Sequence, residues 1–299
     1  MKKATTSAYI SVIIAMTIWS CSFLFTQEAL KSFTPITAVT MRMCMATLFL
    51  GLYGWASGSL QRLRSKDILL FLAAGFMQPF CYFICEAYGL TLVSATIASV
   101  ILSTIPLFSP IFAWLIVRER VSVTNLLGIV VSLVGVLLLV VEKEQVVVSG
   151  LGLVLLGGSV LSAIIYSTLL RKIPSNYSNV SIVFYVHAAS LLFFIPTFFI
   201  FDFQRWGELP ILTSSVVCLV VLALFASMIG YILFCKAVRT IGVTKANTFC
   251  NIEPAVTALA VWILFGENLP WIKWVGVIIV IVGLFVSQIQ SKKKSTNAM

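Results

Sequence analysis

Hydrophobic residues run through this 299-residue chain in long blocks, and most of the charges fall between the blocks. A helix needs about 20 apolar residues to cross the hydrocarbon core of a bilayer. The blocks therefore predict ten membrane spans, at residues 8–30, 36–56, 67–90, 94–117, 123–141, 150–171, 178–201, 210–236, 243–265 and 271–290. The predicted fold class is an all-α integral membrane protein with ten transmembrane helices.

The overall composition excludes an ordinary water-soluble domain. Hydrophobic residues make up 60% of the chain, charged residues only 10%, and the mean hydropathy is +1.08. Soluble domains are about half apolar and a quarter charged, and they could not cover this much apolar surface. We therefore expect a multi-pass protein that contacts the lipid bilayer directly.

The basic residues predict the orientation of the chain in the membrane. With the N-terminus inside, fifteen of the twenty Lys and Arg residues fall at cytoplasmic ends and four in outer loops, while Arg42 lies within a span. This asymmetry is typical of membrane proteins and fits an even number of spans with both termini cytoplasmic. The net charge of +10 then faces anionic headgroups, so we expect no nucleic-acid partner.

The two halves of the chain repeat. Four pairs of residues recur at a spacing of 148 positions: Pro106 and Pro254, Glu119 and Glu267, Gly128 and Gly276, Gly135 and Gly283. This shared spacing predicts a duplication, with a first five-span repeat over 1–145 and a second over 146–299. Because five is odd, the second repeat must enter the membrane inverted. Inverted repeats place a substrate site at their interface, near the middle of the membrane.

Several short motifs carry a family resemblance. They are "W-S-C-S-F" from Trp19, "M-R-M-C-M-A" from Met41, "S-T-I-P-L-F-S-P" followed by "R-E-R", and "N-I-E-P-A-V" followed by "F-G-E". In order and spacing they resemble the EamA-type branch of the drug/metabolite transporter superfamily. The resemblance implies ten helices, inverted repeats, a central cavity built from both halves, and export of amino acids or other small metabolites. It also implies a bacterial inner (plasma) membrane, and it leaves a homodimer open.

Glu253 is the first candidate for a functional side chain. It lies about nine residues into its predicted span, directly before Pro254, and ionisable groups inside spans are expensive and usually functional. It could bind the amine of a substrate or carry a coupled proton; alternatively, it caps the backbone freed by the proline. Ile105 occupies the matching position of the first repeat, so an acid is specific to the second half. Asn251 is a neighbouring candidate for the cavity.

The other ionisable candidates are expected toward the outer ends of the first three spans. Arg42 and Glu86 lie at similar predicted depth, and Glu28 closes the first span on the same side. Arg42 and Glu86 predict either a gating charge pair that could hold a zwitterion, or a structural ion pair between two spans. Glu86 also differs from the more usual pattern of the family, which has an aromatic or aliphatic residue there.

Uncharged side chains complete the predicted cavity. Trp19 and Tyr82 are candidate aromatic walls, and Gln78 is a candidate polar lining residue. Pro106 and Pro254 predict breaks within spans four and nine, because a proline frees a backbone carbonyl that lipid cannot satisfy. The single histidine, His187, is either a proton relay or a packed, hydrogen-bonded helix residue.

The sequence predicts neither a metal site nor a cofactor. The seven cysteines lie in apolar segments without clustered ligands, so we interpret them as small packing residues. No nucleotide-binding motif is present. The resulting hypothesis is a secondary transporter, not an enzyme, that exports amino-acid-like or amphipathic metabolites by alternating access. A channel and a membrane-embedded enzyme acting on lipid are the alternatives.

Overall fold

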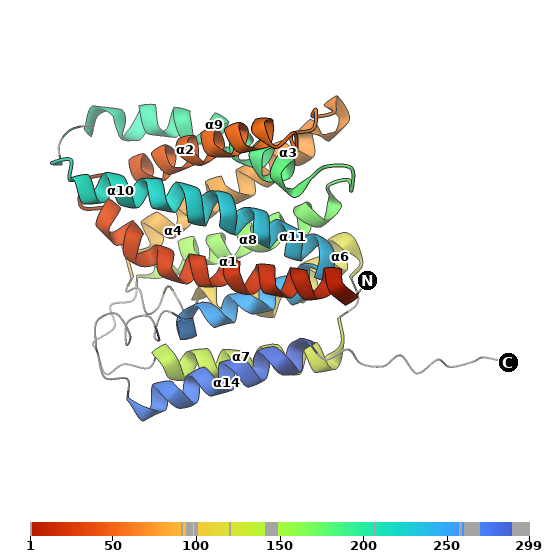
Figure 1. The fold of residues 1–299 in the computed structure, drawn as a ribbon. Helices are drawn as coiled ribbons and strands as arrows, with labels where there is room; N and C mark the ends of the chain where they lie inside the picture. The colour runs from red at the N-terminus through yellow and green to blue at the C-terminus, as the bar shows by residue number, and fades with distance from the viewer. Residues whose placement is uncertain are drawn as a thin grey trace.

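The computed structural model describes residues 2–90, 92–93, 98, 101–119, 121–140, 149–205, 207, 209–256, 259 and 270–288. These residues form helices and turns and no strand. Long helices lie roughly side by side as a bundle, and the first turn of α1 (Lys2–Ala29) and the last turn of α14 (Trp271–Gln288) lie at the same end of it (Figure 1). The predicted all-α class is therefore confirmed.

Seven helical stretches are long and apolar enough to cross a membrane, at residues 4–22, 35–56, 65–89, 150–172, 179–201, 213–241 and 271–288. Two shorter apolar helices, α6 (Ile105–Val117) and α7 (Val123–Val140), follow the third stretch. The predicted spans 94–117 and 243–265 fall partly outside the described residues. The described residues thus provide seven candidate membrane spans.

Two of these stretches are composite helices. The third consists of η1 (Ser65–Asp67), α3 (Ile68–Gly75), the π-helical η2 (Phe76–Cys81) and α4 (Tyr82–Leu90). The sixth consists of α10 (Thr213–Val221), the π-helical η4 (Leu222–Gly230) and α11 (Tyr231–Ile241). Moving η2 forward by 148 positions places it inside η4. The two halves are therefore interrupted at equivalent places.

The other long helices begin at polar caps. α8 (Gly150–Lys172) starts after Ser149, whose hydroxyl accepts a hydrogen bond from the Gly152 amide at 3.4 Å. α9 (Asn179–Phe201) starts after Ser178, whose hydroxyl accepts from the Ser181 amide at 3.0 Å. These caps satisfy amide groups that the first helical turn leaves unpaired. α2 (Pro35–Ala56) instead starts with a proline, which has no such amide to satisfy.

α7 and α14 form a closely packed pair at one edge of the bundle (Figure 1). Their bounds also differ by 148 positions at both ends. A Cβ atom added at Gly128 would lie 2.7 Å from the Gly283 carbonyl oxygen, and one at Gly135 would lie 2.8 Å from the Gly276 carbonyl oxygen. Each first-half glycine thus meets the repeat partner of the other one, so the two helices run antiparallel. Only glycine permits this close approach.

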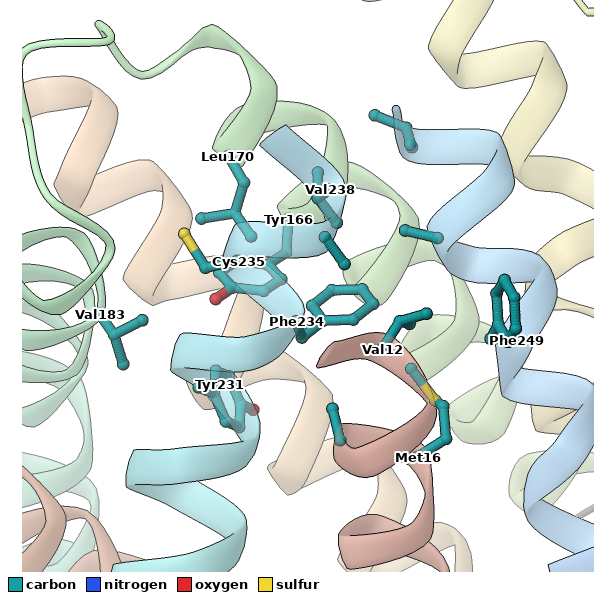
Figure 2. Packing of buried hydrophobic residues seen from close by; sticks show 14 of the residues in the cluster. Val12, Met16, Tyr166, Leu170, Val183, Tyr231, Phe234, Cys235, Val238 and Phe249 are labelled. Atoms are coloured by element: carbon teal, nitrogen blue, oxygen red, sulfur yellow. The ribbon is translucent and has the colours of Figure 1, made fainter. Parts of the chain in front are cut away.

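The main apolar core lies among α1, α8, α9 and α11. Figure 2 shows the side chains of Met16, Tyr166, Val183 and Phe234 converging from these four helices, and each is buried or packed against the buried cluster. η5 (Phe249–Asn251) adds Phe249 at the edge of the cluster. Because helices from both halves build this core, neither half is enclosed by itself.

Candidate functional site

The two broken helices meet residues of the opposite half of the chain. In η2, Gln78 adopts extended dihedrals (φ −148°, ψ 123°) inside an otherwise helical segment, and its amide nitrogen donates to the Tyr231 hydroxyl oxygen at 3.2 Å. In η4, the Ala226 carbonyl oxygen accepts the indole N–H of Trp19 at 3.0 Å. The first contact joins two side chains and the second reaches a backbone carbonyl, so each interrupted segment is tied to the other half of the chain.

Trp19 therefore has a more specific role than the predicted aromatic wall. Its ring packs 5.4 Å from the Tyr231 ring and 5.2 Å from the Phe234 ring, between centroids. Its N–H satisfies a carbonyl group in the interrupted part of the sixth stretch. The side chain joins α1 of the first half to the break in the second half.

Arg42 lies in α2 with only 6% of its surface exposed. Its Nε atom donates to the Ser227 hydroxyl at 2.5 Å, and its guanidinium lies 4.9 Å from the centroid of the Phe83 ring. A guanidinium over an aromatic face gains a favourable cation–π interaction. No carboxylate lies within ion-pairing distance of Arg42 in the described part of the chain.

The predicted ion pair between Arg42 and Glu86 is therefore wrong at the level of direct contact. Glu86 instead accepts a hydrogen bond from the Tyr82 hydroxyl at 2.9 Å, one turn earlier on the same face of α4. Arg42 and Glu86 remain close enough for electrostatic attraction. Arg42 contacts Ser227 and Phe83, and Glu86 contacts Tyr82, in place of each other.

Glu253 lies beside the same group of residues. It follows η5 and is half-buried, and it makes no hydrogen bond or ion pair with another described residue. It interacts electrostatically with Glu86 and Tyr82. The structure thus brings together four predicted site residues, Arg42, Tyr82, Glu86 and Glu253, and places Gln78 next to them through Tyr231.

Two predicted site residues lie elsewhere. Asn251 is fully buried, and its amide nitrogen donates to the Ser132 hydroxyl at 2.7 Å, so it attaches η5 to α7 instead of lining a cavity. Glu28 forms an ion pair with Lys31 at 2.5 Å and accepts from the Ser214 hydroxyl at 2.8 Å. Glu28 is therefore a pairing residue at one end of the bundle, separate from Arg42.

The two predicted helix-breaking prolines start helical segments. Pro106 lies in the first turn of α6, and Pro254 lies in the first turn of the helical segment 252–256 that follows η5. A proline is tolerated at these positions because the amide it lacks would have no partner within the helix. Each interruption thus precedes its proline, in the turn 103–104 and in η5 respectively.

Sequence reasoning missed Ser227 and Tyr231 and underrated Phe83. The repeat spacing of 148 contains the signal, because it matches Gln78 with Ala226, next to Ser227, and Phe83 with Tyr231. His187 packs at right angles to Tyr231, with ring centroids 4.8 Å apart, and is fully buried. Its ring nitrogens make no hydrogen bond of normal geometry, and the nearest backbone partners are Val183 and Ser227.

An open apolar groove of about 510 Å³ lies away from this polar group, between α2 and α9. Its lining residues are Thr40, Met41, Cys44, Met45, Ile195, Phe198, Phe199 and Phe203. At about 100° of rotation per residue, Thr40 and Cys44 of the groove lie on the opposite side of α2 from Arg42. The groove is thus part of the outer apolar surface, while the polar group lies inside the bundle.

The described residues contain no group of three His, Cys, Asp or Glu side chains that could hold a metal ion. All seven cysteines are free thiols, and Cys235 is buried on α11. The chemistry available at the polar group is therefore that of one guanidinium, two carboxylates, hydroxyl groups and aromatic faces. Such a set binds polar and charged groups of a ligand.

Comparison with known proteins places this arrangement in a family. The model of the EamA-like transporter family matches the chain twice, over residues 6–141 and 150–288. The chain belongs to the EamA-like transporter family. The two matches of the EamA model cover most of the sequence and divide it close to the predicted repeat boundary.

Similar proteins carry transporter names. The uncharacterized transporter YcxC of Bacillus subtilis (strain 168) is 27% identical, across 99% of this chain and 97% of its own length. An uncharacterized transporter of Archaeoglobus fulgidus is 26% identical, across 93% of this chain and 97% of its own. The protein of Streptantibioticus cattleyicolor named "Probable terminal-alkyne amino-acid exporter" is 20% identical, across 92% and 91%.

A solved crystal structure also resembles the EamA chain described here. It superposes with a TM-score of 0.80 over 95% of this chain and 96% of its own, at 15% sequence identity. At that identity the likeness concerns the fold alone. The described helices therefore have the arrangement of an experimentally determined protein.

Proposed function

We propose that this protein is a secondary transporter that exports small zwitterionic or amphipathic metabolites, amino-acid-like in chemistry. Cargo passes between two inverted five-helix halves by alternating access, in a ten-span chain with both termini cytoplasmic in a bacterial inner membrane. The family and the names of the relatives support transport, and the amino-acid exporter among them supports the cargo class. The rest of the proposal depends on the polar group inside the bundle.

The observation that carries the proposal is the separation of charge at this group. Among the described residues, no acid is in contact with the buried guanidinium of Arg42, and no base is in contact with the half-buried carboxylate of Glu253. Unpaired charges inside a membrane protein cost several kcal/mol and persist where function requires them. A zwitterion offers a carboxylate for Arg42 and an ammonium group for Glu253 and Glu86.

Two observations support the inverted arrangement. The helices α7 and α14 have equivalent bounds in the two halves, run antiparallel, and contact each other reciprocally through Gly128–Gly283 and Gly135–Gly276. A two-fold axis relating the halves generates this reciprocity. The matched interruptions η2 and η4 fit the broken helices found at midplane binding sites of transporters with inverted repeats.

The experiment compares the growth media of bacteria that overproduce the wild-type protein or the Glu253→Gln variant, by untargeted mass spectrometry. We expect one or more amino-acid-like compounds to accumulate only with the wild type. The control is Glu28→Gln, which removes a carboxylate of equal charge at the end of the bundle, and which should export as well as the wild type. Protein in the membrane fraction is quantified for all three.

Equal export by the wild type and Glu253→Gln would remove Glu253 from the cargo site. If no compound is enriched in either medium, the purified protein is tested in proteoliposomes with labelled neutral amino acids. Saturable counterflow there supports a carrier, and flux that does not saturate supports a channel. Absence of flux for every zwitterion tested would overturn the proposed cargo class.

A further inference from the structure

The short helix α12 (Val243–Thr248) stands between two interruptions of the chain. Before it, Gly242 has φ 94° and ψ 166°, a backbone conformation that side chains rarely adopt. After it, η5 tightens to 3-10 geometry, and Glu253 follows within two residues of η5. The backbone geometry thus changes on both sides of this six-residue element, at the places where a rigid-body rotation would be absorbed.

One end of α12 is held by Glu119, which follows α6 in the first half of the chain. The Glu119 carboxylate accepts the Val243 amide at 2.9 Å and the Thr244 amide at 3.2 Å. These amides belong to the first turn of α12 and have no helical partner, so the carboxylate caps the helix from outside.

Gly242 is required for this contact by its space as well as by its φ. A Cβ atom added there would lie 2.8 Å from the nearer Glu119 carboxylate oxygen. Any other residue at position 242 would therefore push the carboxylate away from the amides it caps. Gly242 leaves the space in which the Glu119 carboxylate reaches the first amides of α12.

A second contact lies one turn further along α12. Asn247 is almost fully buried, and its amide nitrogen donates to the Ser109 hydroxyl of α6 at 2.7 Å and to the Ser167 hydroxyl of α8 at 2.9 Å. Both hydrogens of the Asn247 amide are thus used. Polar contacts of Glu119 and then of Asn247 thus join α12 to α6 and to the residue that follows α6, ahead of Glu253 in the sequence.

We propose that α12 is a gate at this end of the bundle, held closed by Glu119 and Asn247, whose rotation about Gly242 and η5 exposes the region of Glu253. The role of the gate in transport rests on the proposed function. The movement itself does not, and it can be measured without any cargo. Val243 and Ala246 of α12 also pack in the main apolar core, so the rotation must open this apolar contact together with the hydrogen bonds of Glu119 and Asn247.

The native cysteines report the movement. Cys250 lies in η5, half-buried, directly beyond α12. The purified full-length protein, in lipid nanodiscs, is pulsed with N-ethylmaleimide, and each thiol is quantified by peptide mass spectrometry. We expect Glu119→Ala to raise the labelling rate of Cys250 about tenfold, because charged hydrogen bonds are lost, and Glu119→Gln to raise it less. Labelling of the exposed Cys44 should stay unchanged.

The matched control is Asp67→Asn. Asp67 is a buried carboxylate elsewhere in the bundle that accepts the Tyr177 hydroxyl at 2.8 Å, so its loss disturbs the protein without touching α12. Its Cys250 rate should equal that of the wild type. The fully buried Cys235 monitors folding, because it reacts only if the bundle opens generally.

If Glu119→Ala exposes Cys235 and is therefore misfolded, Gly242→Ala tests the same contact with the carboxylate retained, and should also raise the Cys250 rate. Cys250 rates within twofold of the wild type in folded Glu119→Ala or Gly242→Ala protein would overturn the gate. Because labelling needs no cargo, that result leaves the proposed transport intact. Conversely, absence of flux for every zwitterion tested contradicts the proposed function and leaves the gate standing.

Discussion

Trp19 donates its indole N–H to the carbonyl oxygen of Ala226 at 3.0 Å, across 207 positions of sequence. The carbonyl belongs to the π-helical η4, where the regular helical pairing is interrupted. A side chain of the first half thus donates to a backbone carbonyl of the second half. The contact joins the two halves at the π-helical segment.

This contact predicts the effect of Trp19→Phe. Phenylalanine keeps most of the ring packing but has no N–H, so the Ala226 carbonyl is left buried without its donor. We expect a loss of about 1–3 kcal/mol in the free energy of unfolding. Unfolding in detergent measures it. The control is Trp55→Phe, because Trp55 is 81% exposed on α2 and should change little. Equal losses in the two variants would contradict the role given to the N–H.

A glycine of the α7–α14 pair and a glycine of α8 should respond differently to substitution by alanine. Gly128→Ala inserts a methyl group 2.7 Å from the Gly283 carbonyl oxygen, so the helices must separate, at a cost of about 1–3 kcal/mol. Gly157→Ala in α8 meets no atom within 4 Å and should be neutral or stabilising by up to about 1 kcal/mol. The melting temperature should fall for Gly128→Ala and should stay level or rise for Gly157→Ala. A drop of similar size in both would show that the close approach is unimportant.

Arg42 and Glu86 have separate hydrogen-bond partners, so exchanging their charges should not rescue the protein. Arg42→Glu buries an acid in place of a base and should cost about 3–5 kcal/mol. Because Arg42 bonds to Ser227 and Glu86 to Tyr82, the double variant Arg42→Glu/Glu86→Arg should not recover the lost expression in the membrane. The control reverses the direct pair Glu28 and Lys31, which is partly exposed and should tolerate the swap. Recovery of membrane expression by the Arg42/Glu86 double variant would show that the two side chains pair directly.

Asn251 and Ser132 predict a measurable coupling between η5 and α7. Asn251→Ala and Ser132→Ala each remove one side of a buried 2.7 Å hydrogen bond. We expect a coupling free energy of about 1 kcal/mol in a double-mutant cycle of unfolding, with export unchanged. Additive losses would mean that the two side chains act independently. If the Asn251→Ala protein is stable but does not export, Asn251 contributes to the cargo site as the sequence predicted.

Much of the fold follows from sequence patterns that act locally. Apolar blocks of spanning length determine that the chain is a bundle of membrane helices, because lipid leaves the backbone no other way to satisfy its polar groups. The spacing of 148 predicts that the chain repeats, and the glycines at 128, 135, 276 and 283 mark the two helices that approach each other most closely. These features need only the order of residues.

The partners of the polar side chains were decided by the tertiary structure. From the sequence, Arg42 and Glu86 share a depth and opposite charge, so a direct pair is the natural prediction. In the folded chain, the Ser227 hydroxyl of η4 accepts from Arg42, and the Tyr82 hydroxyl donates to Glu86. Asn251 likewise points to α7 and not to a cavity. Depth along a helix is a local quantity, whereas the direction in which a side chain finds its partner depends on how broken helices from both halves pack together.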